Sequence, residues 1–135
     1  MNKLIMTVGL PRSGKSTWAK EQSEEFGCPI VNPDSIRLAL YGQPFIAEGE
    51  TMVWAIAKYM VTSLFLAGHT TVILDATNTT KKRRDEWLNP LWECEFKYFD
   101  TPQDVCIERA KSIGRVDLVY VIKQMAETMD LEGVI

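Results

Sequence analysis

The sequence predicts an α/β fold of three layers (α/β/α), in which a parallel sheet of about four strands is packed between helices. Short apolar runs alternate with segments of helical periodicity, and these runs lie at 3–8, 30–32, 70–75 and 96–99. The chain has 135 residues, of which 46% are hydrophobic, which is enough for one domain with its own core. We therefore expect a single domain over residues 1–135, with its strands in the spatial order 2-3-1-4.

The first two strands are each followed by a helix. The continuous apolar run over 3–8 is typical of a buried parallel strand, and the helix at 15–26 should end at Gly27. After the second strand, Pro33 is preset for a first helical turn, and the helix that it begins should end near Gly42.

A long core helix is expected next, ending before Gly68. Its apolar residues follow the i, i+3, i+4 pattern and are Val53, Ile56, Ala57, Met60, Val61 and Leu64. A strand over 70–75 and a turn lead to another helix, which Pro90 should end or kink. We expect this helix to carry the basic run 81–84 outward and to point three apolar residues inward, namely Trp87, Leu88 and Leu91.

The last third predicts one strand and two helices. The strand is expected over 96–99, and Thr101 with Asp104 resembles a capping box at the start of a helix that runs to about Lys111. After a loop with Gly114, an amphipathic helix is indicated by Leu118, Val121, Ile122, Met125 and Met129.

Composition excludes several classes of protein. The net charge of -3 argues against broad binding to duplex nucleic acid, although a local basic groove is compatible with it. The cysteines are odd in number and lack C-x-x-C spacing, so we expect neither disulfides nor zinc, and a reducing cytosol. The opening apolar run is too short for a signal peptide, and Lys58 interrupts the longest apolar segment, so no membrane span is expected.

The segment from Gly9 to Thr17, GLPRSGKST, matches the phosphate-binding (Walker A) loop at every fixed position, between a strand and a helix. Its glycines let successive N–H groups converge on an anion, and the helix N-terminus adds partial positive charge. We expect the loop to bind the phosphates of ATP through Gly9, Pro11, Arg12, Ser13, Gly14, Lys15, Ser16 and Thr17. Lys15 would reach the β and γ phosphates, and the Ser16 hydroxyl would ligate Mg²⁺.

Two carboxylates should face this loop, because ligands bind at the carboxyl ends of parallel strands. Asp34 follows the second strand, and Asp75 ends the third. Phosphoryl transfer to a hydroxyl needs a base, and Arg37, one helical turn after Asp34, suits an anionic group of the acceptor. Spacing alone equally supports Asp34 as a helix cap, and Asp75 as the cap of the next helix is a further alternative.

Three segments resemble a known family. They are 9–19, Asn32 to Arg37, and Asp75-Ala76-Thr77-Asn78 with Arg83-Arg84, and they resemble the kinase domain of the polynucleotide 5′-hydroxyl kinases known from bacteriophages and the wider P-loop kinases. The resemblance covers nearly the whole chain, which is shorter between the second and third strands. It implies a P-loop NTPase fold, ATP and Mg²⁺, and a hydroxyl acceptor.

The resemblance also implies residue roles. Lys15 and Ser16 bind ATP and magnesium, Asp34 is the general base, and Arg37 holds an acceptor phosphate. A D-x-T-N turn beside the acceptor is made by Asp75, Thr77 and Asn78. Asp75 would act through a magnesium-bound water, so that it counts with Ser16 as a metal residue, or by holding a lid arginine.

A small lid is expected around 109–117. The family places an arginine for the γ-phosphate where this chain has Ile113, and Arg109 and Arg115 flank that position. Either would supply the charge from a shifted register. If neither does, the transition state loses a stabiliser worth about 10³ or more in rate.

The expected function is ATP-dependent transfer of the γ-phosphate to a hydroxyl, foremost the 5′-hydroxyl of a polynucleotide or nucleoside. A nucleotide, another small molecule or a modified DNA base is the alternative acceptor, because the shortened region changes the acceptor side. Ile113 leaves a third alternative, an ATP-binding module with little or no turnover. The oligomeric state is left open.

Two further features of the sequence have competing interpretations. The basic run 81–84 opposes the dipole of its helix, which suggests an acceptor backbone nearby, yet a solvated helix face explains it more simply. The four tryptophans are expected in the core rather than as platforms for bases, and they are Trp18, Trp54, Trp87 and Trp92.

Overall fold

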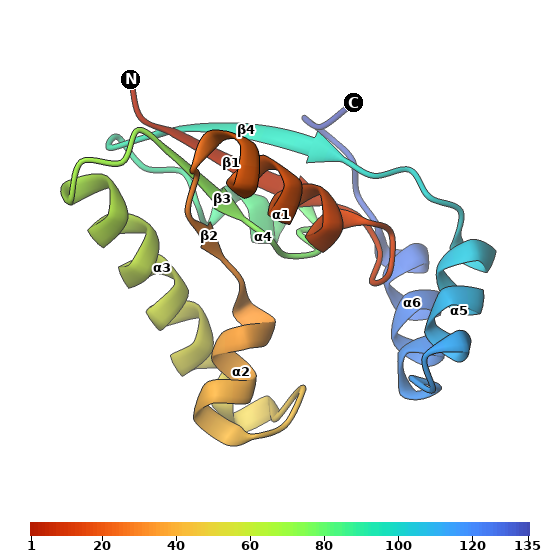
Figure 1. Ribbon diagram of the computed structural model, residues 1–135. Coiled ribbons are helices and arrows are strands. Elements are labelled where there is room, and N and C mark those ends of the chain that lie inside the picture. Colours follow the sequence, from red (N-terminus) through yellow and green to blue (C-terminus); the bar gives the residue numbers. More distant parts are fainter.

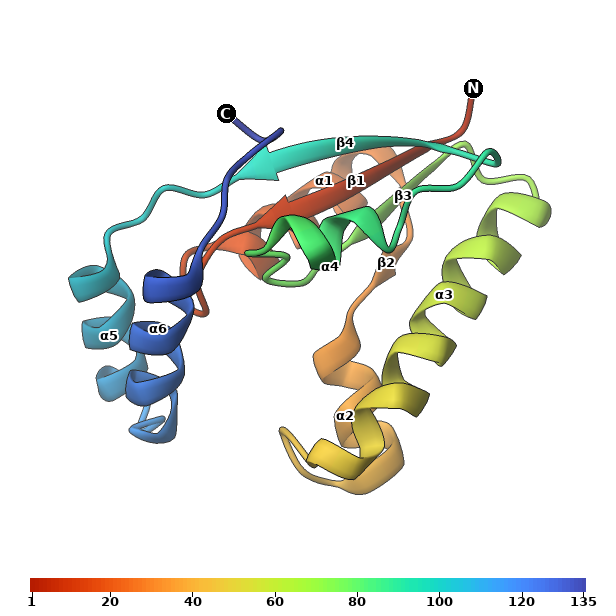
Figure 2. The same ribbon diagram turned by 180° about the vertical axis from the view of Figure 1, so that it is seen from behind.

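The computed structural model describes residues 1–135 and contains one parallel sheet in the order β2-β3-β1-β4. The elements are β1 (Lys3–Val8), α1 (Lys15–Phe26), β2 (Ile30–Val31), α2 (Pro33–Tyr41), the 3-10 turn η1 (Ala47–Gly49), α3 (Glu50–Leu66), β3 (Thr71–Leu74), α4 (Lys81–Asp85), β4 (Glu93–Tyr98), α5 (Gln103–Ser112) and α6 (Asp117–Thr128). Helix α1 covers one face of the sheet and α4 lies on the other, as opposite views show (Figures 1 and 2). The predicted α/β class and strand order are confirmed.

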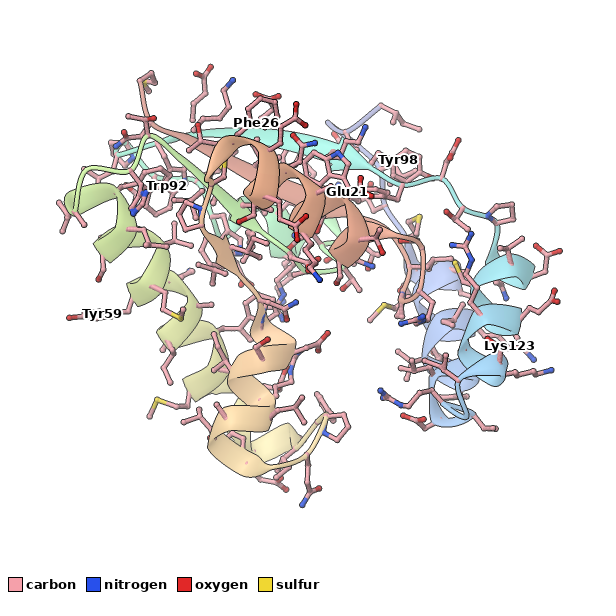
Figure 3. All side chains as sticks on the ribbon, viewed as in Figure 1. Glu21, Phe26, Tyr59, Trp92, Tyr98 and Lys123 are labelled. Atoms are coloured by element: carbon pink, nitrogen blue, oxygen red, sulfur yellow. The ribbon has the colours of Figure 1, made fainter.

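The main core lies between α3 and the sheet. Strand β1 contributes Leu4 and Met6, and α3 contributes a buried stripe at i, i+4 spacing, made by Val53, Ala57, Val61 and Phe65. Phe65 was absent from the predicted stripe, and Met60, which was included, is 37% exposed. Trp92 lies beside the C-terminal end of α3 (Figure 3), where its ring stacks on Phe65 with centroids 5.4 Å apart.

A second, smaller core joins the phosphate loop to the C-terminal helices. Leu10 of the loop packs with Cys106 and Ala110 of α5 and with Ile122 of α6. The α5–α6 pair and the α2–α3 pair project to the same side of the sheet and stand apart in both views (Figures 1 and 2). None of the helices is both long and apolar enough to cross a membrane.

The helix after β3 differs from its prediction. Helix α4 ends at Asp85, well before Pro90, and Leu88 and Leu91 are exposed rather than inward. Arg84, predicted to point outward, is 2% exposed because its guanidinium donates to three backbone carbonyls. Only Trp87 of the predicted apolar face is buried.

The predicted capping box at α5 does not form. The N-cap residue is Pro102, with no side-chain cap, and the Thr101 hydroxyl instead donates to the carbonyl of Ser13, 2.8 Å away. Strand β4 begins at Glu93, before the predicted strand, because it pairs with β1 from Lys3 onward. The prediction missed only the first residues of the strand, because exposed Glu93 and Glu95 interrupt the apolar pattern there.

Candidate active site

The phosphate loop adopts a conformation that suits an anion. Arg12 and Gly14 both have positive φ, 66° and 105°, and such a backbone turns N–H groups toward one point. Gly9 is required for space, because a Cβ there would lie 2.7 Å from Ser13 Oγ and 3.1 Å from Phe99 Cβ. The Thr101 contact with Ser13 supports the loop from outside.

Lys15, the first residue of α1, folds its amine back into the loop. The side chain is 7% exposed, and Nζ donates to the carbonyl of Leu10 at 2.6 Å and to Ser13 Oγ at 3.4 Å. Burial lowers the pKa of Lys15 to about 8, and the nearby Asp75 carboxylate opposes this shift. The amine is therefore a desolvated donor that holds neutral oxygens, ready to exchange them for a phosphate.

Asp75 directly follows β3 and faces α1. Its Oδ2 accepts hydrogen bonds from Ser16 Oγ at 2.8 Å and from Asn32 Nδ2 at 3.0 Å, and the residue is 5% exposed. Thr80, and not Asp75, caps α4. The structure thus brings the two predicted metal residues, Ser16 and Asp75, into direct contact.

This pair fits a magnesium ion. A hydroxyl and a buried carboxylate offer adjacent hard oxygens, and both hydrogen-bond donors to the carboxylate are neutral groups. The chain has no group of three or more His, Cys, Asp or Glu side chains that would enclose a metal. Mg²⁺ needs only one or two protein ligands when water and nucleotide phosphates complete its coordination shell.

Asp34 and Arg37 lie together on α2. Asn32 caps this helix through Ser35 N, which leaves Asp34 free of capping, with a side chain that is 79% exposed. Arg37 Nη1 donates to Asp34 Oδ1 at 2.7 Å. Its Nε and Nη2 bind both carboxylate oxygens of Glu50, at 2.9 and 2.7 Å.

Sequence reasoning missed Glu50. It begins α3, where an acidic residue is favoured by the helix dipole, so its presence had a sufficient local explanation. A hydrogen bond from Arg37 lowers the pKa of Glu50, against the smaller opposing effect of burial. Nothing in the spacing of Arg37 and Glu50 indicates their contact, which depends on how α2 packs against α3.

The turn after β3 ties the strand ends together. Asn78, in a left-handed conformation (φ 44°), is 1% exposed and donates from Nδ2 to the carbonyl of Thr7 at 2.8 Å. The Thr7 hydroxyl bonds the backbone of Ala76, and the carbonyl of Thr77 accepts from Gly9 N at 2.9 Å. Asn78 therefore supports the turn from inside, and Thr7 is a second residue that sequence reasoning missed.

The two arginines predicted for a lid pair with groups other than Asp75. Arg109 Nη1 donates to the carbonyl of Arg12 in the phosphate loop at 3.2 Å, and Arg115 forms two hydrogen bonds with Asp117. Ile113 is the C-cap residue of α5 and is 50% exposed. Of the two arginines, Arg109 is the one that contacts the loop.

The chain is similar to one protein family and to several solved structures. Residues 4–119 match the family AAA_33, described as an AAA domain. A chain in the Pnkp1/Rnl/Hen1 complex is 30% identical, with a TM-score of 0.73 over 80% of this chain and 38% of its own length. A chain in the Pnkp1/Rnl/Hen1 RNA repair complex is 26% identical, with a TM-score of 0.73 over 96% of this chain and 46% of its own.

A more distant similarity shows the fold alone. A gluconokinase from Sinorhizobium meliloti 1021 is 21% identical, with a TM-score of 0.65 over 98% of this chain and 78% of its own length. The chain spans less than half of the first two matched chains, whose further parts have no counterpart in these 135 residues.

Proposed function

The chain belongs to the AAA_33 family of AAA domains and has a P-loop kinase fold, and we propose that it transfers the γ-phosphate of ATP to a 5′-hydroxyl of a polynucleotide or nucleoside. The observation that carries this proposal is the Asp34–Arg37 pair on α2. A carboxylate beside a guanidinium offers a base for a hydroxyl and a cation for a neighbouring phosphate. Two similarities support the proposal. The motifs of this chain resemble those of the 5′-hydroxyl kinases, and the chain is 30% identical to a chain of the Pnkp1/Rnl/Hen1 complex.

The nucleotide side is assigned to the phosphate loop. Its N–H groups and the amine of Lys15 bind the phosphates, and Ser16 and Asp75 would hold Mg²⁺, which when bound neutralises phosphate charge. Arg109, already on the loop, is placed to bring positive charge to the transferred group, with Arg115 as the other lid arginine. We propose one domain over 1–135, with its lid around 109–117, in a reducing cytosol.

The acceptor side is assigned to α2 and the turn after β3. Asp34 accepts the proton of the attacking hydroxyl, whose oxygen bonds to the γ-phosphorus while the bond from that phosphorus to the β–γ bridging oxygen breaks. ADP leaves, and the proton remains on Asp34. Arg37 orients the phosphate next to the hydroxyl, and Thr77, a half-buried residue of the turn after Asp75, is proposed to contact the acceptor.

Glu50 favours a second candidate, a small acceptor that carries no phosphate, such as a sugar acid. It takes two of the donors of Arg37 and cancels its charge, which weakens Arg37 as a phosphate ligand. A site built for hydroxyl groups has less need of a free cation there.

Transfer of labelled γ-phosphate separates these functions. The panel holds a 5′-hydroxyl oligonucleotide, a nucleoside, a nucleoside 3′-monophosphate, gluconate and shikimate, each with wild type and Lys15→Ala. Label on the nucleic-acid acceptors that requires Lys15 supports the proposal. Label on a sugar acid alone supports the second candidate, and ATP binding without any transfer would show a binding module.

A further inference from the structure

Trp54 of α3 has two guanidinium groups beside its ring. The Arg83 guanidinium carbon lies 4.3 Å from the ring centroid, and that of Arg37 lies 5.8 Å from it. Added together, these distances limit the separation of the two guanidinium carbons to about 10 Å. Arg83 is therefore a spatial neighbour of Arg37, although α4 and α2 are distant in sequence.

Within the basic run of α4, Arg83 has a different environment from the other residues. Lys81 pairs with Asp85 at 2.7 Å, and Arg84 is buried among carbonyls. Lys82 is exposed and has no ion pair. Arg83 pairs with Glu86 at 3.1 Å, but both side chains are more than a third exposed, so this pair contributes little and exchanges readily with another anion.

Arg37 alone is a poor phosphate ligand. Glu50 and Asp34 together take hydrogen bonds from Nε, Nη1 and Nη2, and their two negative charges exceed its single positive charge. A phosphate that approaches Arg37 therefore needs a second cation nearby. Arg83 supplies one, and its effect on Glu50 shows that it belongs to the same electrostatic neighbourhood, since it helps to lower the pKa of that carboxyl.

We propose that Arg83, held against Trp54, binds a phosphate of the acceptor strand next to the one at Arg37, and thereby makes the site selective for acceptors with several phosphates. Stacking leaves the N–H edge of a guanidinium free and orients it for the planar donor pattern that phosphate accepts. Successive phosphates of one strand advance by about 3.4 Å along a duplex axis, and the distance between them is longer than this rise because the strand winds around the axis. Two guanidinium carbons that are at most about 10 Å apart can therefore reach neighbouring phosphates of one strand.

This inference rests on the proposed function and assigns it a substrate class. An oligonucleotide with a 5′-hydroxyl reaches both arginines, whereas a nucleoside 3′-monophosphate has one phosphate and reaches Arg37 alone. The two acceptors share the reacting hydroxyl and the nearest phosphate, so the ratio of their kcat/KM values reports the contribution of the further phosphates, which Arg83 is proposed to bind.

The test compares kcat/KM for these two acceptors in wild type, Arg83→Gln and the control Lys82→Gln. We expect Arg83→Gln to lower kcat/KM for the oligonucleotide about tenfold, through KM, and to change the value for the monophosphate less than about twofold. The slope of log KM against log salt for the oligonucleotide should also fall by about 0.7. Lys82→Gln should change neither acceptor.

Arg83→Lys keeps the charge without the planar fork, and we expect it to recover part of the oligonucleotide rate. Circular dichroism and ATP affinity equal to wild type show that each variant is folded. An equal loss on both acceptors, or no loss on the oligonucleotide, overturns the inference while wild-type transfer upholds the proposed function. Wild type that phosphorylates neither of these acceptors nor a nucleoside overturns both.

Discussion

Arg37 of α2 donates to both carboxylate oxygens of Glu50, the first residue of α3, from Nε at 2.9 Å and from Nη2 at 2.7 Å. A bidentate pair of this kind fixes the plane of the guanidinium. Its third nitrogen then points at Asp34. Glu50 thus determines the position of the donor that faces the proposed base.

Glu50→Gln should reveal how much the pair of Arg37 and Glu50 contributes to the free energy of unfolding, and how this contribution depends on pH. The pKa of Glu50 is lowered in the folded state, so its contribution to the free energy of unfolding is present at neutral pH and is lost as pH falls through that lowered value. We expect the variant to be about 1 kcal/mol less stable at pH 7, with the difference shrinking as the pH falls below the ordinary range of a Glu carboxyl. Urea denaturation from pH 3 to pH 7 measures it, and a difference independent of pH would contradict it.

The lowered pKa of Lys15 predicts that ATP binding depends on pH. Its pKa of about 8 means that the folded apo protein loses this proton above pH 8, and ATP phosphates should raise the pKa again. We expect the affinity for ATP to fall above about pH 8 and binding near pH 8.5 to take up part of a proton. Titration calorimetry in buffers of different ionisation enthalpy measures the uptake.

Two variants control this result. Lys15→Arg stays charged and should show no proton uptake, while Lys15→Ala should abolish transfer and keep a native circular dichroism spectrum.

The lowered pKa of Lys15 also predicts how the stability of the apo protein changes with pH. Because the folded pKa is lowered from 10.5 to about 8, the free energy of unfolding of the apo protein should rise between these pH values, and a fall would refute the assignment.

Asp34→Asn tests the general base. The amide keeps the shape and the contact with Arg37 but accepts no proton, so kcat should fall by about 10² to 10⁴. ATP affinity should be unchanged, because Asp34 is exposed on α2 and lies outside the phosphate loop. Rapid-quench measurement of a single turnover reports this step, and near-normal turnover would leave Asp34 without a role in chemistry.

Local sequence signals predicted the parts of this site that depend on one segment. Residues adjacent in the sequence determine each of these parts, namely the phosphate loop, the helix start at Pro33 and the acidic ends of the strands. Glu50 and Thr101 were not predicted in their roles, because their contacts join segments that only the packed fold brings together. Thr101 also shows how a local capping pattern yields to a tertiary hydrogen bond with Ser13.

Asp75→Asn tests the metal site. The amide retains one oxygen for Ser16 but loses the charge that a divalent cation needs, so the Mg²⁺ concentration for half-maximal transfer should rise by about tenfold or more. Activity against Mg²⁺ at saturating ATP measures this change. Asn32→Ala, which removes the other donor to Asp75, should alter the Mg²⁺ requirement less, and an equal shift would indicate a structural effect.

Arg84 should couple the C-terminal segment to the turn after β3. Its guanidinium donates to the carbonyls of Asn78, Asp130 and Glu132 at 2.9, 2.6 and 3.0 Å, and Asp130 N donates to Thr79. Arg84→Met fills similar space but leaves these carbonyls without their donor, and we expect the free energy of unfolding to fall by about 2–4 kcal/mol. Hydrogen exchange should rise first in 129–135 and in the turn at 76–79. Arg84→Lys, which keeps one charged donor, should lose less, and exchange that rises evenly over the whole chain would show that Arg84 supports the fold without linking these two segments.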